Sequence, residues 1–242
     1  PNTKVIFQIA PAVRVGLGGK FGLPWGENLM GKIVAAVRRM GADFVFDTST
    51  AADFTVVEEA NEFLARVEGG GPLPLFTSCC PAWVRYAEIN HPDLLANIST
   101  CKSPMQMFSP IIKEEYKHSH KKIVVVAVMP CTAKKFEAAR PEFVDENGQP
   151  YTDYVITTQE LIRMIRESGI VMREIEPEAV DMPFGSLSGA GVIFGVTGGV
   201  TEAVLRRVST DKSAANLKSL AFTGVRGMEG VKEASVKYGD LD

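Results

Sequence analysis

Short apolar runs alternate with longer amphipathic stretches along most of the 242-residue chain. The apolar runs predict strands, which cover Val5–Ala10, Asp43–Phe46, Leu73–Phe76, Ile123–Val128 and Asp153–Thr157. The amphipathic stretches predict helices, which cover Asn28–Met40, Ala52–Val67, Pro81–Asn90, Pro104–Tyr116, Thr158–Ser168 and Val200–Val208. This alternation is typical of an α/β fold with largely parallel sheets.

A polar turn over Phe143–Tyr151 divides this pattern into two expected lobes. We expect a first lobe over residues 1–142 and a second over residues 143–242, with mostly parallel sheet flanked by helices. In open α/β sheets, ligands bind beyond the carboxyl ends of the strands. Two cysteine segments, Thr77–Pro81 and Met129–Cys131, directly follow predicted strands. We therefore expect both segments to face an active site in the cleft between the lobes.

The composition excludes several classes of partner. A hydrophobic content of 45% and a charged content of 23% are ordinary for a globular protein. The net charge of −3 gives no general attraction to nucleic acid or to an anionic membrane, so we expect neither partner. No apolar stretch approaches the ~20 residues that a membrane span needs. The chain opens at Pro1 without a signal peptide, as expected of a fragment or a processed chain.

The cysteine pattern indicates neither a disulfide framework nor a zinc finger. The four cysteines are Cys79, Cys80, Cys101 and Cys131, and they form no Cys-x2-Cys pair. This favours a reducing compartment. We expect the cytoplasm, with the periplasm as the alternative.

Two glycine-containing segments come close to nucleotide-binding motifs without matching them. In residues 26–33, Ile33 stands where a phosphate-binding loop needs Ser or Thr after Lys32. We interpret Gly31 there as a residue that allows close packing of a helix. Residues 189–195 resemble a dinucleotide fingerprint, but no convincing strand precedes them and the acidic residue expected about 20 positions later is missing. We interpret that second segment as a tight loop.

The most informative segment is Thr77-Ser78-Cys79-Cys80-Pro81-Ala82-Trp83. Adjacent cysteine side chains leave the backbone in different directions, so one can bind a metal while its neighbour stays a thiol. A cysteine thiol tuned by its surroundings can act as a proton donor as well as a ligand. Two small buried residues after a strand remain the alternative interpretation.

A second segment, Met129-Pro130-Cys131-Thr132-Ala133-Lys134, offers another thiolate that could hold a corner of an iron–sulfur cluster. If a helix begins after Cys131, Lys134 lies near the same place and could donate hydrogen bonds to anionic groups. A buried cysteine followed by a surface lysine is the alternative.

A third feature is a charged row formed by Glu59, Glu62 and Arg66. Their spacing puts them on one face of a predicted helix. Such a row is usually the solvated face of a helix. It is also what a proton needs to travel from solvent to a buried site.

Taken together, these segments resemble the [FeFe]-hydrogenase family. TSCCPAW (77–83) is similar to the first signature of the family and MPCTAKKFE (129–137) to the second. Other family-like stretches are IAPAVRV (9–15), FDTSTAADFTVVEEANEF (46–63), CKSP (101–104) and SGAGVIFGVTGGVTEA (188–203). The resemblance covers nearly the whole chain in the family's order.

The resemblance implies an enzyme that interconverts protons and electrons with H2 at a six-iron H-cluster. This group joins a [4Fe–4S] cubane to a two-iron site that carries CO, cyanide and a bridging dithiolate amine. By position, Cys80 and Cys131 match two of the four cubane ligands, and Cys79 matches the thiol that exchanges protons with the amine. The residues that match the rest of the proton route are Glu59, Ser99, Glu62 and Arg66. Positioned transfer of this kind is general acid–base catalysis.

The resemblance also implies a pocket around the two-iron site. Lys134 matches the residue that donates a hydrogen bond to a cyanide. The other implied lining residues are Met129, Pro130, Ala10, Pro11, Ala12, Ser103, Met105 and Phe194. Ferredoxin or another redox protein is the implied electron partner, and an anaerobic bacterium the expected source. The family pattern gives Cys101 no role, and we interpret it as a small packing residue.

The chain departs from the family by an absence. The third signature is a Cys-x3-Cys arrangement that supplies the remaining two cubane ligands, but no cysteine follows Cys131. We therefore expect this chain alone to be inactive, and its site to be completed by a second chain or a missing C-terminal segment. Smaller departures are Gly19, Met105 and Gln159, where Glu, Gln and Arg are common. Met105 would alter hydrogen bonding beside the cluster.

Three other classes of protein compete with this interpretation. Iron–sulfur assembly factors and prelamin-binding relatives share the fold and the two cubane cysteines but not the relay thiol. Sensory hydrogenase-like proteins typically lose that thiol too, so Cys79 together with Glu59 and Glu62 favours the enzyme. An unrelated α/β protein with buried cysteines does not account for two long matching signatures.

Overall fold

The protein divides into two compact units, each built from two separate chain segments. The computed structural model describes residues 2–186, 188–196, 198–209, 213, 223–224 and 232–233. Unit 1 comprises Pro1–Ala51 and Lys102–Leu187, and unit 2 comprises Ala52–Cys101 and Ser188–Asp242. The division therefore differs from the boundary expected after residue 142, which falls inside unit 1. The reason is that the strand after this point pairs with the strand before it.

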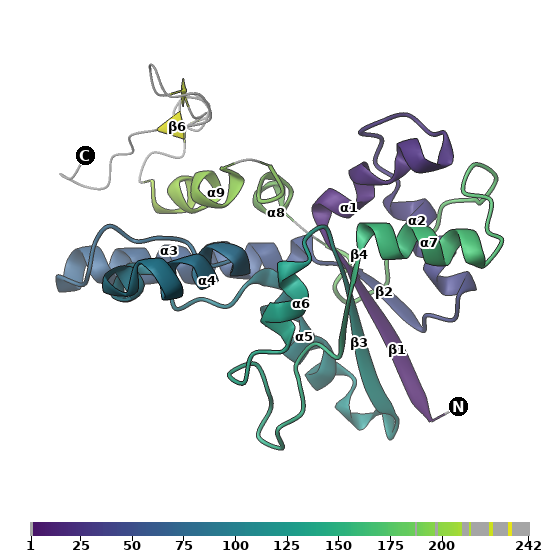
Figure 1. Ribbon diagram of the computed structural model, residues 1–242, viewed down its shortest axis with the longest axis horizontal. Helices are drawn as coiled ribbons and strands as arrows, with labels where there is room; N and C mark the ends of the chain where they lie inside the picture. Colours follow the sequence, from purple (N-terminus) through teal and green to yellow (C-terminus); the bar gives the residue numbers. More distant parts are fainter. Residues whose placement is uncertain are drawn as a thin grey trace. The chain divides into compact units, whose positions relative to one another are not determined.

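Unit 1 is built on a parallel sheet of β1 (Thr3–Ile9), β2 (Phe44–Asp47), β3 (Lys122–Met129) and β4 (Tyr154–Thr157). The strand order is β2-β1-β3-β4 (Figure 1). Ile9 pairs with Asp47 on one side and with Val128 on the other, so the carboxyl ends of these strands share one edge. The α/β class predicted from the sequence is confirmed.

Helices cover both faces of this sheet. One face packs against α1 (Pro11–Gly16), α2 (Met30–Arg39) and α7 (Thr158–Glu167), and the other packs against α5 (Pro104–Glu115). The remaining helical segments of unit 1 are η1 (Gly18–Phe21), η3 (Lys117–Ser119) and α6 (Ala133–Ala138). A Cβ added to Gly31 of α2 would lie 2.7 Å from Pro177 Cβ, closer than carbon atoms approach without a shift. Gly31 therefore permits close packing, as its sequence context suggested.

The described part of unit 2 is mainly helical. Its helices are α3 (Ser49–Gly69, whose first residues belong to unit 1), α4 (Pro81–Asn90), η2 (Pro92–Asn97), α8 (Gly189–Ile193) and α9 (Gly199–Val208). A small apolar cluster joins α3 to α9 through Ala60, Val204 and Val208. The short strands β5 (Thr223–Gly224) and β6 (Lys232–Glu233) pair antiparallel. Residues 189–195, interpreted as a tight loop, instead contain α8, whose N-terminus is capped by the Ser188 side chain.

The six predicted helices are present with ends that differ by less than a turn, and four of the five predicted strands are present. The prediction of a strand over Leu73–Phe76 is wrong. Within that segment only Phe76 forms a bridge, to Ile98. Pro72 and Pro74 have no N–H to donate, so this stretch cannot build a regular ladder. The segment that contains Cys79 and Cys80 therefore follows an isolated bridge and not a strand of the sheet.

Within the part of the chain that the structure describes, none of the helices combines the length and the apolar character that crossing a bilayer requires.

Candidate active site

Helix α3 carries three of the candidate residues within unit 2. Glu59 is fully buried, whereas the side chains of Glu62 and Arg66 keep 16% and 11% of their exposure. The apolar neighbour Ala60 anchors this helix against α9. The charged row is therefore not simply a solvated face, because its first member lies in the interior.

Glu62 is the most densely hydrogen-bonded of the three. Its Oε1 accepts from Arg66 Nη2 at 2.6 Å, and its Oε2 accepts from Ser99 Oγ at 2.7 Å. The backbone N–H of Thr100 contacts both oxygens. Burial acts to raise the pKa of Glu62, but the hydrogen bonds from Ser99, Thr100 and Arg66 outweigh it and lower the pKa. Glu62 is therefore held as a carboxylate.

Arg66 holds the loops around Glu62 in place, in addition to favouring the charged form of Glu62. Its Nη1 donates to the carbonyls of Pro72 and Ala96, and its Nη2 donates to Ile98 as well as to Glu62. A planar guanidinium offers several donors in a fixed geometry, which suits this role. Arg66 thereby ties two loop segments to the end of α3.

Glu59 has the opposite electrostatic setting. Its Oε1 accepts from the Ser78 backbone N–H at 3.3 Å, while Oε2 is buried with no hydrogen-bond partner among the described residues. Burial raises the pKa of Glu59 to about 7, although Ser78 and Ser99 act to lower it. Glu59 can therefore take up and release a proton near neutral pH.

The two adjacent cysteines lie immediately after the Ser78 contact. Cys79 is half-buried and Cys80 is exposed. Cys80 is the N-cap of α4, with Pro81 in the first turn, where proline is favoured. The N-terminus of a helix carries a partial positive charge, which favours an anionic group such as a thiolate. The structure thus places different surroundings around the two thiols.

Cys101 belongs to this group of hydrogen-bonded residues, although no motif in the sequence assigns it a role there. Its Sγ lies 3.6 Å from Glu62 Oε2, and its carbonyl accepts from Ser78 Oγ at 2.6 Å. Burial raises the pKa of its thiol to about 12, so the thiol stays protonated. The interpretation of Cys101 as a packing residue is therefore incomplete. Sequence position alone could not show this, because Glu62 is 39 residues away.

Unit 1 gathers a second set of candidates at the carboxyl ends of β1 and β3. Ala10 caps α1 and donates its backbone N–H to the Val128 carbonyl at 3.0 Å. Pro11 and Ala12 begin α1, and Met129 ends β3. Because β1 and β3 are neighbours, these segments lie side by side at one sheet edge.

Cys131 and Lys134 follow directly on β3. Cys131 is half-buried, Pro130 is exposed, and a helix does begin after Cys131, at Ala133. Lys134 Nζ lies 2.8 Å from Glu137 Oε2, and only 13% and 5% of these side chains are exposed. A buried ion pair of this kind fixes the position of the ammonium group.

The remaining candidates lie on two other elements. In unit 1, Ser103 caps α5 by position, and its Oγ is buried with no hydrogen-bond partner among the described residues. Met105 is almost fully buried in the sheet core. In unit 2, Phe194 ends α8 and is half-buried.

The donor set fits an iron–sulfur group only in part. Cys80 lies in unit 2 and Cys131 in unit 1, and the convergence of their sulfurs stays a prediction. A cubane normally takes four thiolates, and the described residues contain no cluster of three or more His, Cys, Asp or Glu side chains placed to hold a metal. The orphaned Ser103 Oγ is a buried donor of the kind that a bound polar group would satisfy. The described residues thus offer thiols and one buried, unpartnered hydroxyl to such a group, without a complete ligand set among them.

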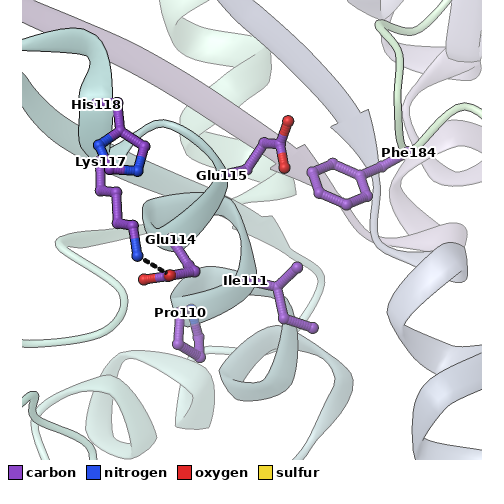
Figure 2. A pocket seen from close by; sticks show the side chains of 7 residues that line it. All are labelled: Pro110, Ile111, Glu114, Glu115, Lys117, His118 and Phe184. Carbon is purple, nitrogen blue, oxygen red and sulfur yellow. Dashed lines mark hydrogen bonds and ion pairs between the residues drawn. The ribbon is translucent and has the colours of Figure 1, made fainter.

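An open pocket of about 740 Å³ lies elsewhere in unit 1, and its lining side chains are drawn in Figure 2. Its apolar side is formed by Pro110, Ile111 and Phe184, and an ion pair between Lys117 and Glu114 lies across from Phe184. None of its lining residues is a thiol or one of the candidates above. This pocket carries no part of the candidate chemistry.

Comparison with a protein-family model shows a match over residues 3–242 to the iron-only hydrogenase large subunit, C-terminal domain. The chain is 48% identical over 250 residues to the NADP-reducing hydrogenase subunit HndD of Solidesulfovibrio fructosivorans, covering 99% of this chain and 43% of that relative. It is 44% identical over 241 residues to iron hydrogenase 1 of Clostridium pasteurianum, covering 98% of this chain and 42% of the relative. The chain thus spans less than half the length of these relatives.

Solved structures and more distant relatives agree with this similarity. The apo [FeFe]-hydrogenase HydA1 of Chlamydomonas reinhardtii, variant C377H, matches with a TM-score of 0.79 and 37% identity. That match covers 94% of this chain and 58% of HydA1. The cytosolic iron-sulfur assembly component 3 of Bos taurus is 31% identical over 238 residues, covering 93% of this chain and 50% of the relative.

Proposed function

Because the chain belongs to the iron-only hydrogenase large-subunit family, we propose that it forms part of a catalytic domain that reversibly reduces protons to H2. When bound, a six-iron H-cluster would supply the redox chemistry of this reaction. Cys80 and Cys131 would each contribute one thiolate to it. A second chain or a further segment with two more cysteines would complete the cubane.

The observation that carries the proposal is the network around Glu59 and Glu62. It contains a buried carboxyl with a pKa of about 7, held by the Ser78 N–H, and a partly exposed carboxylate that accepts from the Ser99 hydroxyl. Such groups can pass protons between solvent and the interior near neutral pH.

We propose that Glu62, held by Arg66, receives protons from the solvent side. The Ser99 hydroxyl donates to Glu62 and acts to lower the pKa of Glu59, and we propose that it passes a proton between the two carboxyls. Ser78 holds Glu59 beside the segment that carries Cys79. Cys79 would then deliver the proton to the reacting group. The electron partner, expected to be a ferredoxin or another redox protein, stays a prediction.

The remaining pocket residues would hold and orient the two-iron part of the group. Lys134 would donate to a cyanide while Glu137 keeps its ammonium in place. The lining residues Ala10, Pro11, Ala12, Met129 and Pro130 would exclude water at the shared edge of β1 and β3.

The decisive experiment uses the complete, matured protein. Infrared bands of iron-bound CO and cyanide together with H2 evolution would support the proposal. Cys79→Ala should leave the cubane intact and lower turnover by orders of magnitude, whereas Cys80→Ala should prevent cluster retention. Full activity of Cys79→Ala would refute the relay assignment.

Iron–sulfur assembly without H2 turnover is the second candidate, because an assembly component is among the relatives. It predicts a stable iron–sulfur cluster without CO or cyanide bands. The same infrared measurement therefore separates the two functions.

A further inference from the structure

Cys101 makes contacts through three of its groups, each to a different residue of the proposed relay region. Its N–H donates to Ser99 Oγ at 3.1 Å, and its carbonyl accepts from Ser78 Oγ at 2.6 Å. Its thiol donates to Glu62 Oε2 at 3.6 Å, within the range for a hydrogen bond to sulfur. Cys101 thus connects the Ser78 contact of Glu59 with the Ser99 contact of Glu62.

The thiol contact completes the support of the Glu62 carboxylate. Oε1 is held by Arg66 and Oε2 by Ser99, with the Thr100 N–H shared between them. A rotation of the carboxylate that broke the Ser99 contact would also break the contact with Cys101. The thiol therefore restricts Glu62 to the orientation in which Ser99 can exchange a proton with it.

We propose that Cys101 is a positioning residue of the relay, whose S–H fixes Glu62 toward Ser99. This inference rests on the proposed function. Burial keeps the thiol protonated, with a pKa of about 12, so it remains a donor wherever Glu62 is a carboxylate. The backbone contacts of Cys101 do not depend on its side chain. A substitution can therefore test the thiol alone.

The first test needs neither cluster nor turnover. The infrared S–H stretching band of Cys101 in the iron-free full chain is identified by its loss in Cys101→Val, which keeps similar volume but has no donor. Glu62→Gln should move this band to higher frequency, because an amide oxygen is a weaker acceptor than a carboxylate. A band that does not move in Glu62→Gln would overturn the inference.

The second test is the pH profile of H2 evolution by the complete, matured protein. Cys101→Val should lower the rate about two- to fivefold, as expected for the loss of one weak hydrogen bond. It should also move the acidic limb to higher pH, because Glu62 loses a donor that favours its charged form. The charged and titratable groups that face Glu62 are Arg66 and Glu59 on α3, together with Cys101.

Two further variants make this second test specific. Cys101→Ser keeps a donor and should recover at least half of the lost rate. Asn90→Ala removes an exposed side-chain hydrogen bond on α4, away from the relay, and should match the wild type. A wild-type pH profile in Cys101→Val would overturn the inference. Absence of H2 turnover in the wild type would instead refute the proposed function and leave the S–H result standing.

Discussion

Ser99 Oγ lies 2.7 Å from Glu62 Oε2, although 37 residues separate them in the chain. The hydroxyl donates to a carboxylate whose charge Arg66 maintains from the other side. A hydroxyl is both donor and acceptor, so in this position it can accept a proton and release another. The proposed route therefore depends on this single contact between Ser99 and Glu62.

Replacing Ser99 by Ala should lower H2 evolution by at least tenfold. Positioned proton transfer typically contributes 10²–10⁴-fold to a rate, and alanine leaves no group to carry the proton. Ser99→Thr keeps the hydroxyl and serves as the control. The measurement is turnover of the complete protein at equal iron content. A wild-type rate in Ser99→Ala would exclude Ser99 from the route.

Glu59 should make the stability of the folded protein depend on pH. Its pKa rises from 4.5 to about 7 on folding, so the folded state binds this proton more tightly. The resulting stability is complete below pH 4.5 and is lost as the pH rises through 7, a change on the order of 3 kcal/mol. Glu59→Gln stays neutral, so its free energy of unfolding should not show this decline. Urea denaturation between pH 5 and pH 8 tests this, and parallel curves for the two proteins would contradict it.

The buried ion pair of Lys134 and Glu137 should contribute far more to the free energy of unfolding than the exposed ion pair of Lys135 and Glu160. Glu137→Ala leaves the buried ammonium without this carboxylate and should lower the free energy of unfolding by about 3–5 kcal/mol. Lys135 pairs with Glu160 at 2.6 Å, but 43% and 45% of these side chains are exposed. Lys135→Ala should therefore cost less than about 1 kcal/mol. Equal decreases in the free energy of unfolding for the two substitutions would show that the burial of Lys134 and Glu137 does not add to stability.

The chain by itself should retain little cubane. Reconstitution with iron and sulfide offers it two assigned thiolates, Cys80 and Cys131, where four are normally needed. We expect well below four iron atoms per chain after gel filtration, and no H2 evolution. A polypeptide that supplies two further cysteines should restore the iron content. Stable stoichiometric loading of the isolated chain would contradict this view of the site.

Regular periodicity explains which elements could be predicted from the sequence. The alternation that marks β1 and β3, and the spacing along α3, correspond to elements of the structure. Leu73–Phe76 looked like a strand because it is apolar, but Pro72 and Pro74 remove the donors that a ladder needs. Apolar character predicts burial, while the hydrogen bonds decide the conformation.

Within the candidate site too, some features follow from the spacing of residues in the sequence and others do not. The spacing of Glu59, Glu62 and Arg66 was enough to place them on one helix. The contacts of Ser78, Ser99 and Cys101 depend on the path of the loops and could not be read from spacing. The pairing of Lys134 with Glu137 could have been predicted from the sequence, because residues at i and i+3 on a helix are neighbours.

The pairing of β1 with β3 also sets when this protein can fold. Ile9 pairs with Val128, and 119 residues of chain separate them. At a synthesis rate of 5–20 residues per second, the ribosome needs on the order of ten seconds to supply the partner strand. Until then one edge of the nascent β1 is open to other polypeptides. A holding chaperone that reaches the first strand during synthesis would therefore protect the yield of this protein more than one that acts after release.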